Sequence, residues 1–185
     1  NFQNLEWLKC LPKIIPSGQI MGNICTKKAT ELSLPKNLRV IAGTTDSNAG
    51  VLATFPDEDD GITILGSTIV IKKFVTKPLA GKGISNHKLF GNWLSGGASN
   101  TGAAILLDFF NVEYIEELSK QINPHKSTGL NLLPLLNQGE RFPVDDPNLQ
   151  PKLEPRPVSD SLYLHALFEG LAKIEAKGWR KLNEL

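Results

Sequence analysis

The sequence lacks the features that would mark a secreted, disulfide-rich or membrane protein. Only 2 of its 185 residues are cysteine, Cys10 and Cys25, and they form no C-x-x-C motif. We expect both to be buried thiols in a reducing compartment. No apolar run approaches the roughly 20 residues needed to span a bilayer, and no apolar stretch follows a basic N-terminus. An intracellular protein with no membrane partner is therefore expected.

The sequence also lacks a charge imbalance. Its 20 basic and 19 acidic residues leave a net charge of +1, without the broad basic footprint of a nucleic-acid-binding protein. Hydrophobic residues make up 41% and charged residues 21%, which excludes wholesale disorder. The length fits one large domain or two small ones. We therefore predict a folded protein whose ligands are recognised by local features.

Hydrophobic periodicity predicts an α/β protein. Residues 38–43 are expected to form a buried strand, and residues 62–71 a hairpin whose tip is Gly66-Ser67-Thr68. A single extended piece is expected at 87–95. Further expectations are a short extended piece at 19–24, helices at 27–32, 49–53, 103–110, 112–122 and from Ser159-Asp160 to Ile174, and a proline-rich connection at 138–157.

Charge is distributed unevenly along the chain. Residues 56–61 hold four carboxylates between a proline and a glycine, with no apolar residue to bury, so they are the expected domain boundary. Residues 61–107 contain five lysines and no Asp, Glu or Arg. This second stretch predicts a local positive field that favours an anionic ligand.

Asp46 is the first candidate for chemistry, because it lies among hydroxyl residues where the predicted strand 38–43 meets the helix 49–53. A carboxylate there can act as a general base toward a substrate hydroxyl. Local sequence alone favours the alternative that Asp46 is a helix N-cap.

Two glycine-containing segments are candidates for binding phosphate. The small residues of Gly66-Ser67-Thr68 would let backbone N–H groups approach an anion, although an ordinary tight turn explains them equally well. Gly97 and Gly102 satisfy G-x-x-x-x-G, but Ala103 follows instead of lysine, so a P-loop is rejected. A glycine-rich helix N-terminus, capped by Ser99 or Asn100, remains. It would serve either phosphate binding or close helix packing.

The three histidines show no metal-ligand spacing, and no G-x-S-x-G nucleophile motif is present. We therefore expect no protein-bound metal cluster and no serine hydrolase.

Taken in order, three segments resemble the FGGY carbohydrate kinases: Val40 to Ala49, Ile64 to Thr68, and Gly96 to Gly102. Gly139-Glu140-Arg141-Phe142-Pro143, followed by Asp145 to Leu149, resembles the plant and cyanobacterial D-ribulose kinase branch, formerly described as xylulose-kinase-like. The resemblance covers nearly the whole chain.

The resemblance implies part of a ribonuclease H-like, actin/hexokinase-type ATPase fold. Residues 1–55 would end the first, sugar-binding lobe, and residues 56–185 would begin the second, nucleotide-binding lobe. In this family the sugar and ATP meet in the cleft between the lobes, and Mg²⁺ bridges the nucleotide oxygens. Family members act as ATP-dependent phosphotransferases, in the cytoplasm or, in plants, also in the chloroplast.

The resemblance also assigns roles to residues. Asp46 matches the catalytic base, and Thr45 stands beside it among the substrate-binding residues. Gly66, Ser67 and Thr68 match the second phosphate-binding turn. Gly97 and Gly102 lie where the glycine-rich helix start approaches the nucleotide. Many members have Gly-Thr-Ser at this turn, whereas this chain has the two hydroxyl residues in the opposite order. Both hydroxyls are retained, so we expect an altered geometry of the turn and not a loss of binding.

Two family motifs are absent from the sequence: an Asp-x-Gly-Thr phosphate loop before Asp46 and a paired-glycine adenosine motif after the final helix. We therefore expect a piece of a longer kinase that is inactive alone. The alternatives are a truncated, non-catalytic relative that binds a sugar or a protein, and a kinase for xylulose, glycerol or another polyol.

Overall fold

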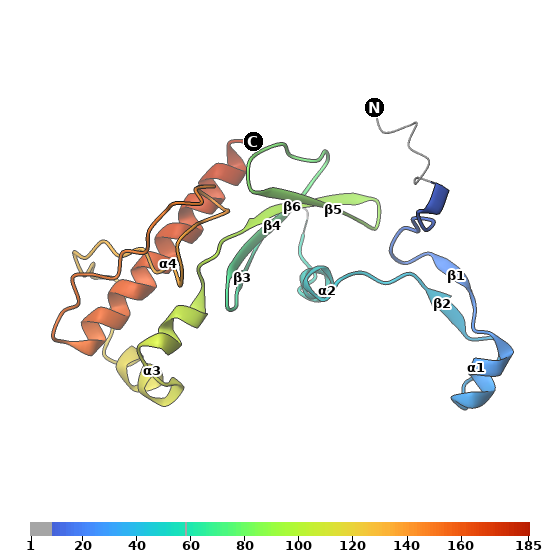
Figure 1. The fold of residues 1–185 in the computed structure, drawn as a ribbon, viewed down its shortest axis with the longest axis horizontal. Helices are drawn as coiled ribbons and strands as arrows, with labels where there is room; N and C mark the ends of the chain where they lie inside the picture. Colours follow the sequence, from blue (N-terminus) through green and yellow to red (C-terminus); the bar gives the residue numbers. More distant parts are fainter. Residues whose placement is uncertain (1–8, 58) are drawn as a thin grey trace. The chain divides into compact units, whose positions relative to one another are not determined.

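The computed structural model describes residues 9–57 and 59–185 and divides into two compact units (Figure 1). The first consists of the described residues up to Phe55 together with Lys88–Gly91, and the second of Pro56–His87 and Asn92–Leu185. The assignment of these units to two lobes stays a prediction. Among the helices of the described residues, none is both long and apolar enough to cross a membrane.

The first unit is built on a two-stranded antiparallel sheet. β1 (Ile20–Asn23) pairs with β2 (Arg39–Ile41), α1 (Thr26–Glu31) lies between them in the chain, and α2 (Asp46–Ala53) follows β2. These are the elements predicted at 19–24, 27–32 and 49–53. Every residue of β2 is exposed, however, so the prediction of a buried strand was wrong. A sheet of two short strands is too small to bury a strand, and β1 and β2 are both exposed along their whole length.

The prediction of buried thiols was also wrong, because Cys10 and Cys25 are both free and exposed. In the described residues up to Phe55, Ala29 and Val51 are the apolar side chains with no exposed surface. Short helices around a two-stranded sheet leave little interior in which a thiol can be buried.

The second unit contains a four-stranded sheet in the order β3-β4-β6-β5. The predicted hairpin is confirmed as β3 (Gly61–Leu65) paired antiparallel with β4 (Ile69–Val75), with Leu65 opposite Ile69 next to the turn. β6 (Asn92–Ala98) pairs antiparallel with the other edge of β4. The single extended piece predicted at 87–95 is in fact two strands, β5 (Ile84–Leu89) and β6.

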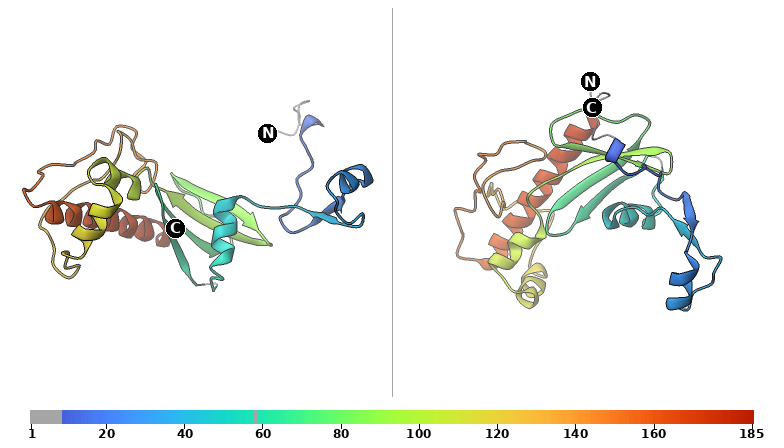
Figure 2. Two further views of the ribbon diagram at one scale, coloured as in Figure 1. Left: turned by 90° about the horizontal axis from the view of Figure 1, so that it is seen from below. Right: turned by 45° about the vertical axis from the view of Figure 1, so that its right-hand side comes forward.

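The long helix α4 (Asp160–Asn183) packs against this sheet (Figures 1 and 2). It begins where predicted, with the Ser159 hydroxyl accepting a hydrogen bond of 3.3 Å from the N–H of Leu162. Leu171 and Ile174 on its apolar stripe pack in one cluster with buried residues of β4. Burial of each such side chain contributes about 1.5–3 kcal/mol to folding, so the stripe fixes α4 on the sheet.

Between the sheet and α4, the chain forms a 3₁₀ helix, η3 (Ala103–Asp108), and then α3 (Val112–Ser119). The helix predicted at 103–110 is therefore a 3₁₀ helix, and its N-cap is Gly102, not Ser99 or Asn100. Apolar side chains of η3 and α3 form a second core cluster with the first turns of α4. This cluster fixes the segment that follows Gly102.

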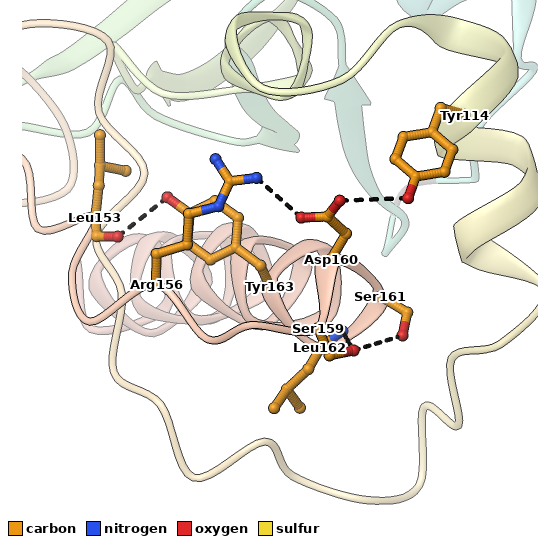
Figure 3. A network of polar contacts seen from close by, with 8 residues as sticks. All are labelled: Tyr114, Leu153, Arg156, Ser159, Asp160, Ser161, Leu162 and Tyr163. Atoms are coloured by element: carbon orange, nitrogen blue, oxygen red, sulfur yellow. Dashed lines mark hydrogen bonds and ion pairs between the residues drawn. The ribbon is translucent and has the colours of Figure 1, made fainter.

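Arg156 joins the start of α4 (Figure 3) to the segment between η3 and α3. Its guanidinium lies 4.8 Å from the ring centroid of Tyr163, and it also stacks over two phenylalanine rings of the same cluster. Its Nη2 is 2.9 Å from Oδ1 of Asp160, whose Oδ2 accepts a hydrogen bond of 3.3 Å from the Tyr114 hydroxyl. Burial and then Asp160 raise the pKa of Tyr114, as expected for a hydroxyl that donates to this carboxylate.

Arg156→Met should lower the free energy of unfolding by about 1 kcal/mol, because it removes the cation–π contacts and the ion pair while keeping an apolar stem. Urea unfolding of the protein measures the change. Arg180→Met, which removes an exposed arginine near the end of α4, is the matched control. Equal stabilities of the two variants would contradict the structural role of Arg156.

Candidate functional site

Asp46 lies at the start of α2 in the first unit. The N-cap is Thr45, in an extended conformation (φ −73°, ψ 156°) and without a side-chain cap bond. Asp46 is therefore the first helical residue and not the cap that local sequence favoured. Its Oδ1 accepts a hydrogen bond of 2.6 Å from the N–H of Ser47, and the described residues offer its Oδ2 no donor.

This arrangement leaves Asp46 able to receive a proton. The side chain is exposed and stands in the first turn of α2. The neighbouring Thr45 side chain is also exposed, and its hydroxyl has no hydrogen-bond partner within the described part of the chain. A substrate hydroxyl could thus meet the carboxylate at Oδ2 and the threonine beside it.

The predicted phosphate turn, residues 66–68, joins β3 to β4 in the second unit. Its backbone is held by a hydrogen bond of 3.1 Å from the Gly66 N–H to the Thr68 carbonyl and one of 2.8 Å from the Ala103 N–H to the Gly66 carbonyl. The N–H groups and hydroxyls of Ser67 and Thr68 have no acceptor or donor among residues 9–57 and 59–185. Two adjacent N–H groups and two hydroxyls are a donor set that suits phosphate oxygens.

Gly102 packs directly behind this turn. A Cβ added to it would lie 2.5 Å from the Thr68 Cα and closer still to the Ser67 carbonyl oxygen. No side chain fits between these backbone atoms, so the glycine is required for the close approach of the two segments. The structure therefore shows the packing function of Gly102, whereas its approach to a nucleotide stays a prediction.

Gly97 lies elsewhere than the sequence indicated. It is part of β6, not of a helix start, and a Cβ added to it would overlap the ring of Phe142. The expected glycine-rich helix start thus applies to Gly102 alone. A nucleotide-binding role for Gly97 stays a prediction.

Apolar side chains lie beside the turn, and the positive field expected from the lysines stays a prediction. A groove of about 350 Å³ lies beside Ser67, and its other walls come from η3 and α3: Ala103, Ala104, Leu106, Leu107 and Ile115. Of the five lysines in residues 61–107, Lys73 donates to Asn183 and Lys82 pairs with Asp145 at 3.7 Å. Burial, and then the charge of Lys72, lower the pKa of His87, so this histidine adds no positive charge at neutral pH.

No group of three or more His, Cys, Asp or Glu side chains in the described residues is arranged to hold a metal ion. The described residues therefore offer no ready-made ligand set for the expected Mg²⁺.

The buried position of Glu140 is not evident from the sequence. This residue is 4% exposed and accepts hydrogen bonds from the segment 99–102, which precedes η3. The sequence signal is weak: an acidic residue inside a proline-rich connection, followed by Arg141 and then by the apolar Phe142 and Pro143. Such a residue is usually exposed, so only the fold shows that its carboxylate is buried.

No family model matches the sequence. Solved structures do match its fold. The chain aligns with a ligand-bound xylulose kinase from Lactobacillus acidophilus with a TM-score of 0.76 and 19% identity, over 93% of this chain and 37% of the other. A xylulose kinase from Rhodospirillum rubrum gives a TM-score of 0.75 and 19% identity, over 94% and 38% of the two chains.

A gluconate kinase from Lactobacillus acidophilus gives a TM-score of 0.75 and 18% identity, over 93% of this chain and 37% of the other. The chain thus spans less than two fifths of the length of these three structures. At these identities the comparison establishes the fold, and the prediction of a partial actin/hexokinase-type ATPase fold is confirmed.

Proposed function

We propose that the chain is part of an ATP-dependent carbohydrate kinase that phosphorylates a sugar hydroxyl. The observation that carries the proposal is the alignment of more than nine tenths of the chain with kinases for xylulose and gluconate. The exposed carboxylate of Asp46 and the unpaired donors of Ser67 and Thr68 support it, because phosphoryl transfer needs a proton acceptor and groups that bind phosphate.

In the proposed reaction, the Asp46 carboxylate accepts the proton of the sugar hydroxyl as its oxygen attacks the γ-phosphorus of ATP. The bond from the γ-phosphorus to the bridging oxygen breaks, and ADP leaves with that electron pair. The N–H groups of Ser67 and Thr68 bind phosphate oxygens and so orient the group that is transferred. Thr45 contacts the sugar beside the base.

We further propose D-ribulose as the acceptor. The support is sequence resemblance alone, carried by Gly139 to Pro143 and Asp145 to Leu149. Kinases with xylulose and gluconate in their names share the fold, so the fold does not select among acceptors.

The test is ADP release by the protein as its source produces it, after its intact mass has been measured. D-Ribulose, D-xylulose, glycerol and gluconate are compared at equal concentrations with ATP and Mg²⁺. The largest kcat/KM is expected for D-ribulose. A larger value for another sugar overturns only the acceptor, whereas no ADP above the sugar-free rate overturns the kinase itself.

A further inference from the structure

The buried carboxylate of Glu140 has more hydrogen-bond donors than an incidental core acid requires. Its Oε2 accepts from the Ser99 hydroxyl at 2.5 Å. Its Oε1 accepts from the N–H groups of Asn100 at 2.7 Å, Arg141 at 2.9 Å and Phe142 at 3.3 Å. All four donors are neutral groups that point at one carboxylate, which makes this charge acceptable in the interior.

These hydrogen bonds connect two segments that are far apart in the sequence. Glu140 belongs to the proline-rich connection, whereas Ser99 and Asn100 belong to the segment 99–102 between β6 and η3. The Asn100 side chain also donates to the Gly139 carbonyl at 3.0 Å, and the Thr101 hydroxyl donates to the Pro134 carbonyl. The connection, together with Pro134 shortly before it, therefore holds the segment 99–102 from one side.

On its other side, the segment 99–102 holds the turn at residues 66–68. The Ser99 N–H donates to the Ile69 carbonyl at 2.9 Å, and the Ile69 N–H donates to the Thr101 carbonyl at 2.6 Å. Gly102 lies against the backbone of Ser67 and Thr68 without room for a side chain. Any shift of the segment must therefore displace the turn.

The Ser99 hydroxyl lies at the centre of this connection. It donates to Glu140 and at the same time accepts a hydrogen bond of 3.0 Å from the Thr101 N–H. The carboxylate thus fixes the orientation of the hydroxyl, and the hydroxyl fixes the backbone just before Gly102.

We propose that Glu140 is a positioning residue for phosphate binding: its buried carboxylate fixes the segment 99–102 and, through it, the donors of Ser67 and Thr68. The proposal rests on the proposed kinase function. It adds a residue that touches neither sugar nor nucleotide but sets the geometry in which the turn meets phosphate oxygens.

The test is steady-state kinetics of Glu140→Gln in the full protein, with ATP and sugar varied separately. The amide keeps the size of the side chain but replaces one acceptor oxygen by a donor, so the hydrogen bonds to Ser99 and the backbone cannot all form. Loss of a charge-assisted hydrogen bond should let the segment 99–102, and with it the turn at residues 66–68, shift from its position. We therefore expect the KM for ATP to rise about tenfold, while the KM for the sugar stays unchanged. Glu116→Gln, which makes the same chemical change at an exposed site on α3, should change neither.

A merely structural function of Glu140 gives a different result. Loss of folded protein lowers the apparent kcat and leaves both KM values unchanged, and this outcome in a Glu140→Gln variant would overturn the proposal. Where that variant does not fold, Ser99→Ala replaces it. This substitution removes the hydroxyl that bridges Glu140 and the Thr101 N–H, and it does not change the charge of a buried group. We expect a rise of about threefold in the KM for ATP and no change in the KM for the sugar.

ADP release by the wild-type protein distinguishes a failure of the Glu140 proposal from a failure of the proposed kinase function. ADP release by wild type together with an unchanged KM for ATP in Glu140→Gln and Ser99→Ala overturns the positioning function alone. No sugar-dependent ADP release by wild type overturns the kinase function, and the proposal for Glu140 falls with it.

Discussion

Asp46→Asn should lower kcat by about 10²- to 10⁴-fold, the range that general-base catalysis contributes. Asparagine has the size of aspartate, and its amide oxygen can still accept the hydrogen bond that Ser47 donates to Asp46, so the start of α2 should keep its geometry. The amide cannot accept a proton at neutral pH. The loss should therefore appear in kcat, while the dissociation constant for ATP stays within about twofold of wild type.

The measurements are steady-state kinetics of sugar-dependent ADP release and ATP binding by calorimetry, both on the full protein. Asp59→Asn is the matched control, because it neutralises an exposed aspartate in the acidic segment 56–61. An unchanged kcat in Asp46→Asn would remove the base from the proposed mechanism. A parallel loss of ATP binding would instead show that Asp46 contributes to binding.

The sequence predicted those elements whose signals are local. The hairpin of β3 and β4 follows from β-branched residues on both sides of Gly66-Ser67-Thr68. The helix α4 follows from an apolar stripe and the Ser159 cap. In both cases the residues that determine the element lie within it, so no distant partner was needed to find it.

The turn between β5 and β6 was missed because its residues are atypical. Phe90 and Gly91 both have positive φ, 48° and 90°. Two-residue hairpin turns with positive φ are dominated by asparagine, aspartate and glycine, and phenylalanine rarely adopts this conformation. The sequence at 87–95 therefore indicated one continuous extended piece.

Glu140 was missed for a different reason. Two of its donors, Ser99 and Asn100, are supplied from a segment about forty residues earlier in the chain. Burial of a carboxylate is determined by such distant partners and not by its neighbours in the sequence. Local structure was thus predictable where it depends on the residues of a turn or of a helix cap, and unpredictable where it depends on tertiary hydrogen bonds.

Gly102→Val should damage both folding and nucleotide binding. The φ of Gly102 is 177°, an extended value that any residue adopts, so the cost is not backbone strain. It is steric, because a Cβ would lie 2.5 Å from the Thr68 Cα and closer to the Ser67 carbonyl oxygen. These are backbone atoms of the turn and cannot move aside as a flexible side chain would. We expect overpacking to lower the free energy of unfolding by about 1–3 kcal/mol.

Because the displaced atoms carry the proposed phosphate donors, the molecules that remain folded should also bind ATP at least tenfold more weakly. Urea unfolding and calorimetric titration with ATP measure the two effects separately. Gly102→Ala should show both effects, since its Cβ already meets the turn, whereas Gly50→Ala places a Cβ on α2 with nothing within 4 Å and should not destabilise the protein. If Gly102→Val retained both stability and ATP affinity, the turn would not depend on this contact. If only stability fell, the glycine would serve packing alone, and the proposed phosphate site would have to lie away from Ser67 and Thr68.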